Sequence, residues 1–203
     1  MTIRRGQQWG EQVQSPDFLR LVPTDRDARE WVVAQRETDR PLQPLGLGGG
    51  DMARTLGGGT AGRFPGSVMT APIDVLRVHA GGRTTWAVSH VVARRSWWRG
   101  EVWLAMNAQF LGPYDVAPRS HPNDGKVDVV HVRAEMSTRA RRLARDRART
   151  GTHLPHPLLQ TTQAASTDAT FGRPLVLWVD GVRWGTATHV TVTCEPDALT
   201  VYA

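Results

Sequence analysis

Arginine and tryptophan alternate in one short stretch of the sequence, Arg94–Arg95–Ser96–Trp97–Trp98–Arg99. Tryptophan rings can stack on bases or lie in a membrane interface, and the guanidinium groups beside them can bind phosphates. The same stretch can instead be a turn whose rings pack into the core while the arginine heads stay in water. The chain has eight Trp, most of which must be buried in a β-rich protein of this size, so the second interpretation is favoured.

A second basic segment, residues 137–150, reads STRARRLARDRART and is predicted to be helical. Arg139, Arg142 and Arg149, with Arg145 between the last two, fall roughly along one side of this helix at spacings of three and four. We expect both basic segments to contribute to one basic face. The predicted anion-binding residues are Arg94, Arg95, Arg99, Arg142 and Arg145.

The net charge of the chain points to anionic partners. Its formal value is +6, which favours a phosphorylated ligand such as a nucleotide, a nucleic acid, or an anionic lipid or membrane surface. No nucleic-acid-binding motif accompanies the charge, so nucleic acid is the least favoured of these partners. A GC-rich coding sequence would also produce an arginine-rich composition, so charge alone does not decide the function.

Several other chemistries find little support. His153 and His156 are the closest pair among seven His, and no Cys or acidic residue lies near them, so a zinc site is not expected. The single Cys194 excludes an internal disulfide and fits a reducing cytoplasm. The sequence has no G-x-S-x-G motif, no apolar signal-peptide core and no apolar run of about 18 residues. We expect a cytoplasmic protein, or one peripheral at the inner face of the membrane.

The hydrophobic period divides the chain into two parts. Residues 1–72 have the pattern of a truncated α/β segment, with a strand at 18–22, a helix at about 26–37 capped by Thr24 or Asp25, and a glycine turn at 48–50. From Ile73 onward the period is two, which is typical of antiparallel strands. The predicted fold class is α+β, with an antiparallel β-sandwich or barrel over residues 73–203. Strands are expected at 73–79, 84–93, 101–109, 127–133, 161–170, 174–180, 188–194 and 198–202.

Several motifs follow one another in a fixed order over residues 100–203. They are EVWLAMNAQF (101–110) with Leu111–Gly112, Val116–Ala117–Pro118, NDGKVDV (123–129), Thr150–Gly151–Thr152–His153, LWVDG (177–181) and EPDAL (195–199). This succession is similar to the second domain of the bacterial diacylglycerol kinase-like lipid kinases, the family that also includes the sphingosine kinases. No single motif is specific, but their common order is difficult to obtain by chance. The resemblance implies a β-sandwich for this part of the chain.

The resemblance also implies sites for a nucleotide and a cation. Gly49–Gly50–Asp51 resembles the family's Gly-Gly-Asp-Gly-Thr loop, which implies that Gly49, Gly50 and Asp51 bind ATP. The alternative is a plain strand-to-helix turn with Asp51 as the helix cap. By the same resemblance, Asp124 and the backbone carbonyls of His121 and Lys126 would hold Mg²⁺ or Ca²⁺. An Asn-Asp-Gly turn without metal is the alternative there.

Three departures from the family bear on activity. Val182 stands where the family has the glutamate that is expected to be the general base, and Asp180 is the nearest carboxylate that could replace it. A turn aspartate such as Asp180 can also be purely structural. Met52 and Ala53 replace the Gly-Thr of the nucleotide loop, and a Met is a poor substitute where backbone must touch phosphate. The α/β segment and the stretch before Gly100 are also shorter than in the family.

Two functions are consistent with these residues. The first is a degenerate diacylglycerol kinase-like lipid kinase that retains at most weak phosphorylation of a lipid hydroxyl, with ATP and Mg²⁺ as cofactors. The alternative is a non-catalytic binding or scaffold module for an anionic ligand, a membrane headgroup or a partner protein. Val182 and Met52 favour the module, whereas Asp51, Asp124 and Asp180 favour the kinase. We also expect a homodimer, which would cover sheet edges that the truncated segment leaves exposed.

Overall fold

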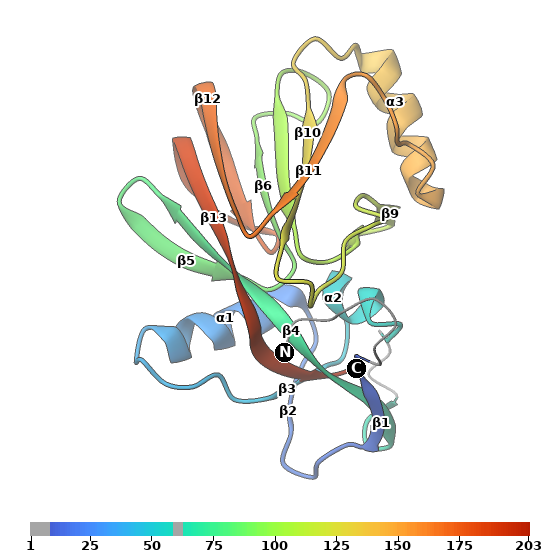
Figure 1. The fold of residues 1–203 in the computed structure, drawn as a ribbon, viewed down its shortest axis with the longest axis vertical. Coiled ribbons are helices and arrows are strands. Elements are labelled where there is room, and N and C mark those ends of the chain that lie inside the picture. The colour runs from blue at the N-terminus through green and yellow to red at the C-terminus, as the bar shows by residue number, and fades with distance from the viewer. Residues whose placement is uncertain (1–8, 59–62) are drawn as a thin grey trace.

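The computed structural model describes residues 9–58 and 63–203 (Figure 1). The amino-terminal part contains the short strands β1 (Glu11–Gln14), β2 (Arg20–Val22) and β3 (Leu45–Leu47), and the helices α1 (Asp25–Arg36) and α2 (Gly50–Thr55). Thr24 caps α1, because its hydroxyl accepts a hydrogen bond from the N–H of Asp27 at 3.2 Å. The helix predicted at about 26–37 is therefore confirmed.

Strands make up most of the remaining chain. The first are β4 (Ser67–Ala80), β5 (Arg83–Ala87), β6 (His90–Arg94), β7 (Val102–Met106), the β8–β9 hairpin (Phe110–Leu111 and Tyr114–Asp115) and β10 (Val127–Val132). Helix α3 (Thr138–Arg147) and a 3₁₀ turn (Ala148–Thr150) precede β11 (Leu159–Ala164), β12 (Ser166–Val179) and β13 (Val182–Tyr202). In the part of the chain that the structure describes, no helix is both long and apolar enough to cross a membrane.

Within residues 9–58 and 63–203, eleven strands form one sheet whose main path is β1-β4-β13-β12-β6-β7-β10-β11. Neighbours on this path are antiparallel, whereas β3 joins the end of β13 in parallel. The sheet folds over on itself, as Figure 1 shows, and its inner faces enclose a core. The core includes Leu76, Trp103, Val129, Leu177 and Val190. The predicted α+β class and antiparallel β-sandwich are confirmed.

The structure corrects the extent of several predicted strands. The strand predicted at 84–93 is two strands, β5 and β6, because the chain turns a corner at Val88–Ser89. The strand predicted at 161–170 is divided at Ala165. Before this residue β11 pairs with β10, and after it β12 pairs with β13. The strands predicted at 188–194 and 198–202 form a single strand, β13, which continues through a register shift between Glu195 and Leu199.

The sheet also passes through the boundary predicted at residue 72. β4 crosses this point without interruption, and it pairs with β13 from His79–Thr191 to Thr70–Tyr202. A second apolar core lies where α1 and α2 cover this end of the sheet, and it includes Val32, Met52 and Leu199. The division into residues 1–72 and 73–203 stays a prediction, and the two parts share one sheet.

Candidate functional site

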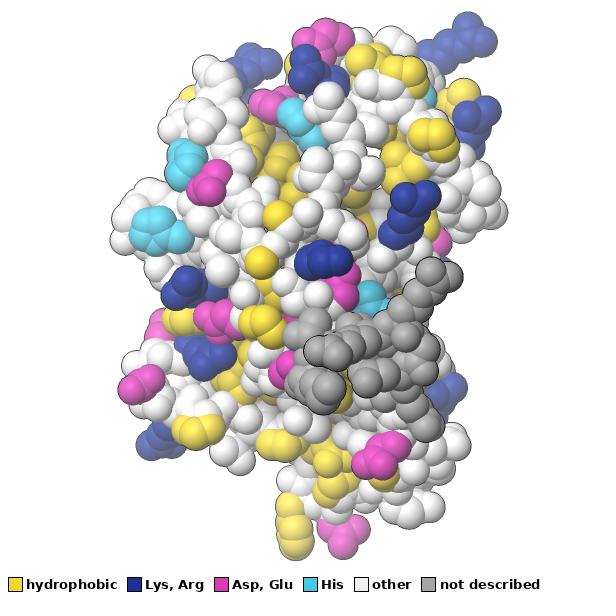
Figure 2. All heavy atoms as spheres, viewed as in Figure 1, with side chains coloured by type: hydrophobic (Ala, Val, Ile, Leu, Met, Phe, Trp, Pro, Cys, Tyr) yellow, Lys and Arg dark blue, Asp and Glu magenta, His cyan; other side chains and the backbone are white. Residues whose placement is uncertain are grey.

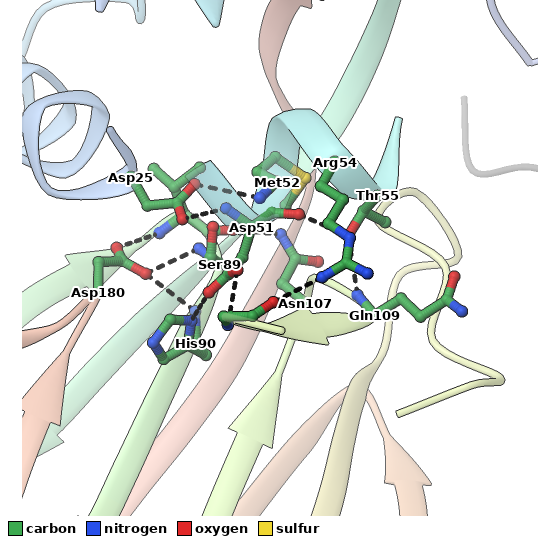
Figure 3. A network of polar contacts seen from close by, with 12 residues as sticks. Asp25, Asp51, Met52, Arg54, Thr55, Ser89, His90, Asn107, Gln109 and Asp180 are labelled. Atoms are coloured by element: carbon green, nitrogen blue, oxygen red, sulfur yellow. Dashed lines mark hydrogen bonds and ion pairs between the residues drawn. The ribbon is translucent and has the colours of Figure 1, made fainter. Parts of the chain in front are cut away.

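The predicted nucleotide loop lies at the start of α2, directly after the buried strand β3. Gly50 has a φ of 98°, and a Cβ there would lie 2.6 Å from the carboxylate of Asp25, so a larger residue does not fit. That carboxylate accepts hydrogen bonds from the backbone N–H of Asp51 at 2.6 Å and of Met52 at 3.1 Å (Figure 3). An internal anion therefore occupies N–H groups that would otherwise be free for a phosphate.

The side chain of Asp51 does not cap α2. The capping residue is Gly49, with no side-chain bond, so the interpretation of Asp51 as a helix cap is wrong. One oxygen of Asp51 accepts a hydrogen bond from the N–H of Gly112 at 2.8 Å, and the other lies 3.8 Å from Nδ1 of His90. Burial, together with the neighbouring Asp25 carboxylate, raises the pKa of Asp51 to about 6. Asp51 thus connects α2 to the β8–β9 hairpin and to the start of β6.

His90 is a buried imidazole at the start of β6. Its residue is 5% exposed, and its Nδ1 has no hydrogen-bond partner among the described residues. Burial lowers the pKa of His90 to about 4, so the ring is neutral near pH 7. The free Nδ1 has almost no exposed surface, so it could accept a hydrogen bond only from a group that enters between it and Asp51. Sequence analysis did not single out this residue.

Asp180, the predicted catalytic residue, lies in the β12–β13 turn and is 4% exposed. Its carboxylate accepts hydrogen bonds from the N–H groups of Val88, Ser89 and His90, at 2.7, 2.9 and 2.9 Å. These three bonds hold the corner between β5 and β6. Burial, with a contribution from Asp25, raises the pKa of Asp180 to about 7 against the opposing effect of the three N–H groups. Both oxygens are bonded to backbone, and a catalytic role for Asp180 stays a prediction.

These side chains line one polar pocket of about 650 Å³. The starts of α1, α2 and β6 bound it together with the β12–β13 turn, and its lining includes Asp25, Asp51, His90, Leu111, Asp180 and Val182. Among the described residues, no three His, Cys, Asp or Glu side chains are grouped so that they could hold a metal ion. As arranged, the pocket does not fit a protein-held Mg²⁺, and the phosphates of ATP would have to displace Asp25. The assignment of Gly49, Gly50 and Asp51 to a nucleotide stays a prediction.

The predicted cation site lies elsewhere, in the turn before β10. Asp124 accepts a hydrogen bond from the N–H of Lys126 at 3.0 Å, and its own N–H donates to the carbonyl of His121 at 3.4 Å. Burial raises the pKa of Asp124. The buried carboxylate of Asp74 supports the turn by accepting the N–H of Gly125 at 2.7 Å. These bonds are those of a self-supported Asx turn, and the role of Asp124, His121 and Lys126 as cation ligands stays a prediction.

The predicted anion-binding arginines lie in two environments. The guanidinium of Arg94 lies over the rings of Trp97 and Trp178, at 4.5 and 5.1 Å from their centroids, and burial lowers its pKa. Arg95 and Arg99, in contrast, are exposed. Arg94 is therefore partly a packing residue, whereas its two neighbours face water.

Helix α3 lies against the same loop. Arg142 and Arg145 lie over the ring of Trp98, at 5.9 and 5.3 Å from its centroid. The buried Arg141 donates hydrogen bonds to the carbonyls of Met136, Trp97, Gly100 and Arg133 and so fixes α3 to the 97–100 loop. The structure thus brings the two predicted basic segments together, although their roles in anion binding stay predictions.

Beneath α3 lies a second, mostly apolar pocket of about 380 Å³. Its floor is the outer face of β7, β10 and β11, and its lining includes Trp97, Trp98, Leu104, Val130, Met136, Ala144 and Ala148. Leu111 lines both this pocket and the polar pocket, and Gly112 lines the apolar pocket while donating its N–H to Asp51. The β8–β9 hairpin is therefore a wall common to both pockets. Sequence analysis missed the apolar pocket; the small residues Ala144 and Ala148, one turn apart, were its only local sign.

The fold defines a class, an antiparallel β-sandwich like the second domain of the diacylglycerol kinase-like lipid kinases, here with a short α/β segment over one end. The chain belongs to the family described as the YegS C-terminal NAD kinase beta sandwich-like domain, which matches residues 76–203. The family resemblance predicted from the sequence is confirmed.

Solved structures show the same fold at low sequence identity. A protein from Bacillus anthracis str. Sterne, described as a diacylglycerol kinase, matches with a TM-score of 0.57 and 11% identity over 79% of this chain and 69% of that chain. A further diacylglycerol kinase structure from the same organism has a TM-score of 0.55 and 13% identity, over 79% of this chain and 66% of that chain. No curated protein matched the sequence. At these identities the similarity concerns the fold.

Proposed function

We propose that this protein binds a lipid alcohol and retains at most weak ATP-dependent phosphorylation of its hydroxyl. The observation that carries the proposal is the common wall at Leu111–Gly112, on one side of which lies an apolar pocket and on the other a polar one. A ligand that reaches past this hairpin into both pockets must have an apolar body and a polar head. A lipid alcohol has this chemistry.

The apolar pocket suits the body of such a ligand. Its volume of about 380 Å³ lies in the range of small-molecule sites, about 300–1,000 Å³. Aliphatic and aromatic side chains dominate its lining, so the burial of an acyl chain there is favourable by about 25 cal/mol for each Å² of apolar surface.

The polar pocket suits the head. A hydroxyl can donate to the oxygen of Asp51 that lies 3.8 Å from Nδ1 of His90. The raised pKa of Asp51, about 6, would also let this carboxylate take the hydroxyl proton near neutral pH. The lining carries both signs of charge, with Arg26 and Arg183 as well as Asp25, Asp51 and Asp180, so a neutral hydroxyl head needs no further counter-charge there.

Two features support weak phosphoryl transfer at most. Asp25 occupies the N–H groups of Asp51 and Met52, so a phosphate competes with an internal carboxylate for them. Val182 lines the polar pocket where the family resemblance places the general base, and a valine accepts no proton. The same two features favour the second candidate, a binding or scaffold module without catalysis.

Fluorescence of the protein's own tryptophans tests the proposal, because Trp97 and Trp98 line the apolar pocket. A monoacylglycerol with a dibrominated chain, kept below its micelle concentration, should quench this fluorescence saturably at one equivalent. Ala144→Phe, which fills the pocket, should abolish the quenching, and Leu143→Phe on the outer side of α3 should preserve it. Equal quenching in both variants, or none in the wild type, would refute lipid binding in this pocket.

A second measurement separates the kinase from the module. Transfer of labelled phosphate from ATP and Mg²⁺ to the same monoacylglycerol should be far below the turnover of ordinary kinases, about 1–100 s⁻¹. A rate in that range would overturn the assignment of weak transfer, and complete absence of product with retained quenching would establish the module. The expected homodimer stays a prediction, which sedimentation of the purified protein would check.

A further inference from the structure

Helix α3 and the 3₁₀ turn that follows it carry most of the protein's excess positive charge. Residues 138–149 contain six Arg and one Asp, a local balance of +5 where the whole chain has +6. Arg141 is buried, and the other five are exposed: Arg139, Arg142, Arg145, Arg147 and Arg149, here called the α3 basic face. In Figure 2, Lys and Arg side chains alternate with hydrophobic ones over the part of the molecule where Figure 1 places α3.

The α3 basic face has few internal partners. Among the described residues, none of its five arginines takes part in an ion pair. Arg142 and Arg145 lie over the ring of Trp98, and Arg145 and Arg149 lie over that of Tyr114 at 4.9 and 5.3 Å from the centroid. The positive charge is therefore not neutralised within the described structure.

Large apolar side chains project from the same region. Leu143 is 52% exposed and Trp97 is 40% exposed, and they are two of the four exposed large hydrophobic residues in the described parts of the chain. Leu143 lies one turn from both Arg139 and Arg147, at the centre of the outward side of α3. Trp97 lies in the loop that Arg141 fixes to the helix, so the two apolar groups are held on one rigid unit.

We propose that the α3 basic face binds the surface of an anionic lipid bilayer, with Leu143 and Trp97 entering the interfacial layer. Arginine side chains are attracted to anionic headgroups, and a leucine and a tryptophan among them add apolar burial at the depth where aromatic rings prefer to lie. A nucleic acid would use the charge but would leave Leu143 exposed to water. The bilayer is therefore the partner that uses both features.

This surface has a consequence for the apolar pocket. Trp97 and Arg145 belong both to the proposed membrane contact and to the lining of the pocket beneath α3. A docked protein would present the pocket close to the lipid phase. The inference goes beyond the proposed lipid-alcohol binding, because docking needs neither an occupied pocket nor a nucleotide.

Co-sedimentation with vesicles tests the proposal. The wild type should bind vesicles of phosphatidylcholine and phosphatidylserine, bind pure phosphatidylcholine vesicles far more weakly, and release as salt is raised. The triple variant Arg139→Gln, Arg142→Gln, Arg147→Gln should lose affinity by about fivefold for each Arg, hence about a hundredfold in total. A matched triple variant with the same charge change, Arg20→Gln, Arg40→Gln, Arg77→Gln, should change the affinity by about twofold at most.

Two single variants separate this surface from the pocket. Leu143→Ser should weaken vesicle binding several-fold without changing the circular dichroism spectrum, because Leu143 is exposed. Ala144→Phe, which blocks the pocket, should bind vesicles as the wild type does. If lipid-alcohol binding fails while these vesicle results hold, the proposed function is wrong and the membrane-binding proposal is still supported.

The proposal is overturned by any of three results. The first is equal loss of affinity in the two triple variants, which would indicate a general effect of net charge. The second is absence of binding to the anionic vesicles at low salt. The third is binding to a DNA duplex that is tighter than vesicle binding and unaffected by Leu143→Ser, which would assign the α3 basic face to nucleic acid.

Discussion

Protonation of Asp180 should stabilise this protein as the pH falls from about 8 to about 5. Two effects oppose each other at this carboxylate. Its burial, with Asp25 near it, favours the protonated form, whereas the N–H groups of Val88, Ser89 and His90 favour the ionised form. Burial dominates and the pKa of Asp180 rises to about 7 from its ordinary value of 3.8.

The sign of the effect follows from proton linkage. Between about pH 4 and pH 7, the folded state holds the Asp180 proton more tightly than the unfolded state, so the free energy of unfolding falls as pH rises through this range. A difference of about three pKa units corresponds to about 4 kcal/mol between the two ends of the range. Burial raises the pKa values of Asp51 and Asp128 as well, both to about 6, which acts in the same direction. Burial lowers the pKa of His90 to about 4, and lowers the pKa values of His121 and His153, which acts in the opposite direction below about pH 6.5. The contribution of Asp180 is therefore the difference between the wild type and a variant that lacks this carboxyl.

Urea unfolding at several pH values, followed by tryptophan fluorescence, measures this slope. Asp180→Asn should remove most of the dependence above pH 6, because the amide does not titrate. Asp17→Asn, at an exposed site, should leave the dependence unchanged. If the three N–H bonds outweigh burial instead, the stability of the wild type relative to Asp180→Asn would rise with pH between about pH 3 and pH 5, and that result would refute the reasoning.

Three further predictions concern the polar pocket and its support. Val182→Glu should raise phosphate transfer to the lipid alcohol by about a hundredfold over the wild-type background, as expected for a restored general base, while Val182→Gln should not; labelled ATP measures this. Asp25→Ala should free the two N–H groups at the start of α2 and tighten nucleotide binding in calorimetric titration, at a cost of about 1 kcal/mol in stability. Unchanged nucleotide affinity would show that Asp25 does not compete with phosphate. Asn107→Ala should destabilise the protein by about 2 kcal/mol in urea, because the Asn107 amide donates to the buried carbonyls of Asp74 and Val88, both at 2.8 Å; a smaller loss would mean that water replaces the amide.

The general fold could be predicted because its signals are local or ordered along the chain. Thr24 precedes an amphipathic stretch and caps α1, and Ser137 caps α3 in the same way. The two-residue period after Ile73 indicates antiparallel strands, and the succession of motifs beyond residue 100 indicates which β-sandwich they build.

The site could be predicted only in part, because its geometry depends on contacts between distant residues. Asp25 and Asp51 are 26 positions apart. Nothing in the sequence near them indicates that the Asp25 carboxylate accepts the N–H groups at the start of α2, the helix that contains Asp51. The corner at Val88–Ser89 exists because Asp180, about ninety positions later, accepts its N–H groups, so the sequence there reads as one strand. Trp97 was expected in the core and is exposed, because Arg141 holds its loop on the outer face.

The ladder between β4 and β13 limits how this molecule can move. Many two-lobed enzymes expel water from their sites by closing a hinge between lobes. Here the helices α1 and α2 and the sandwich are attached to the same pair of strands, which remain hydrogen-bonded on both sides of the shift at Glu195–Leu199. A hinge at the polar pocket would have to break this ladder. For the proposed phosphoryl transfer, water would have to be excluded by the ligand itself and by the small β8–β9 hairpin, because the ladder keeps the pocket in a fixed shape.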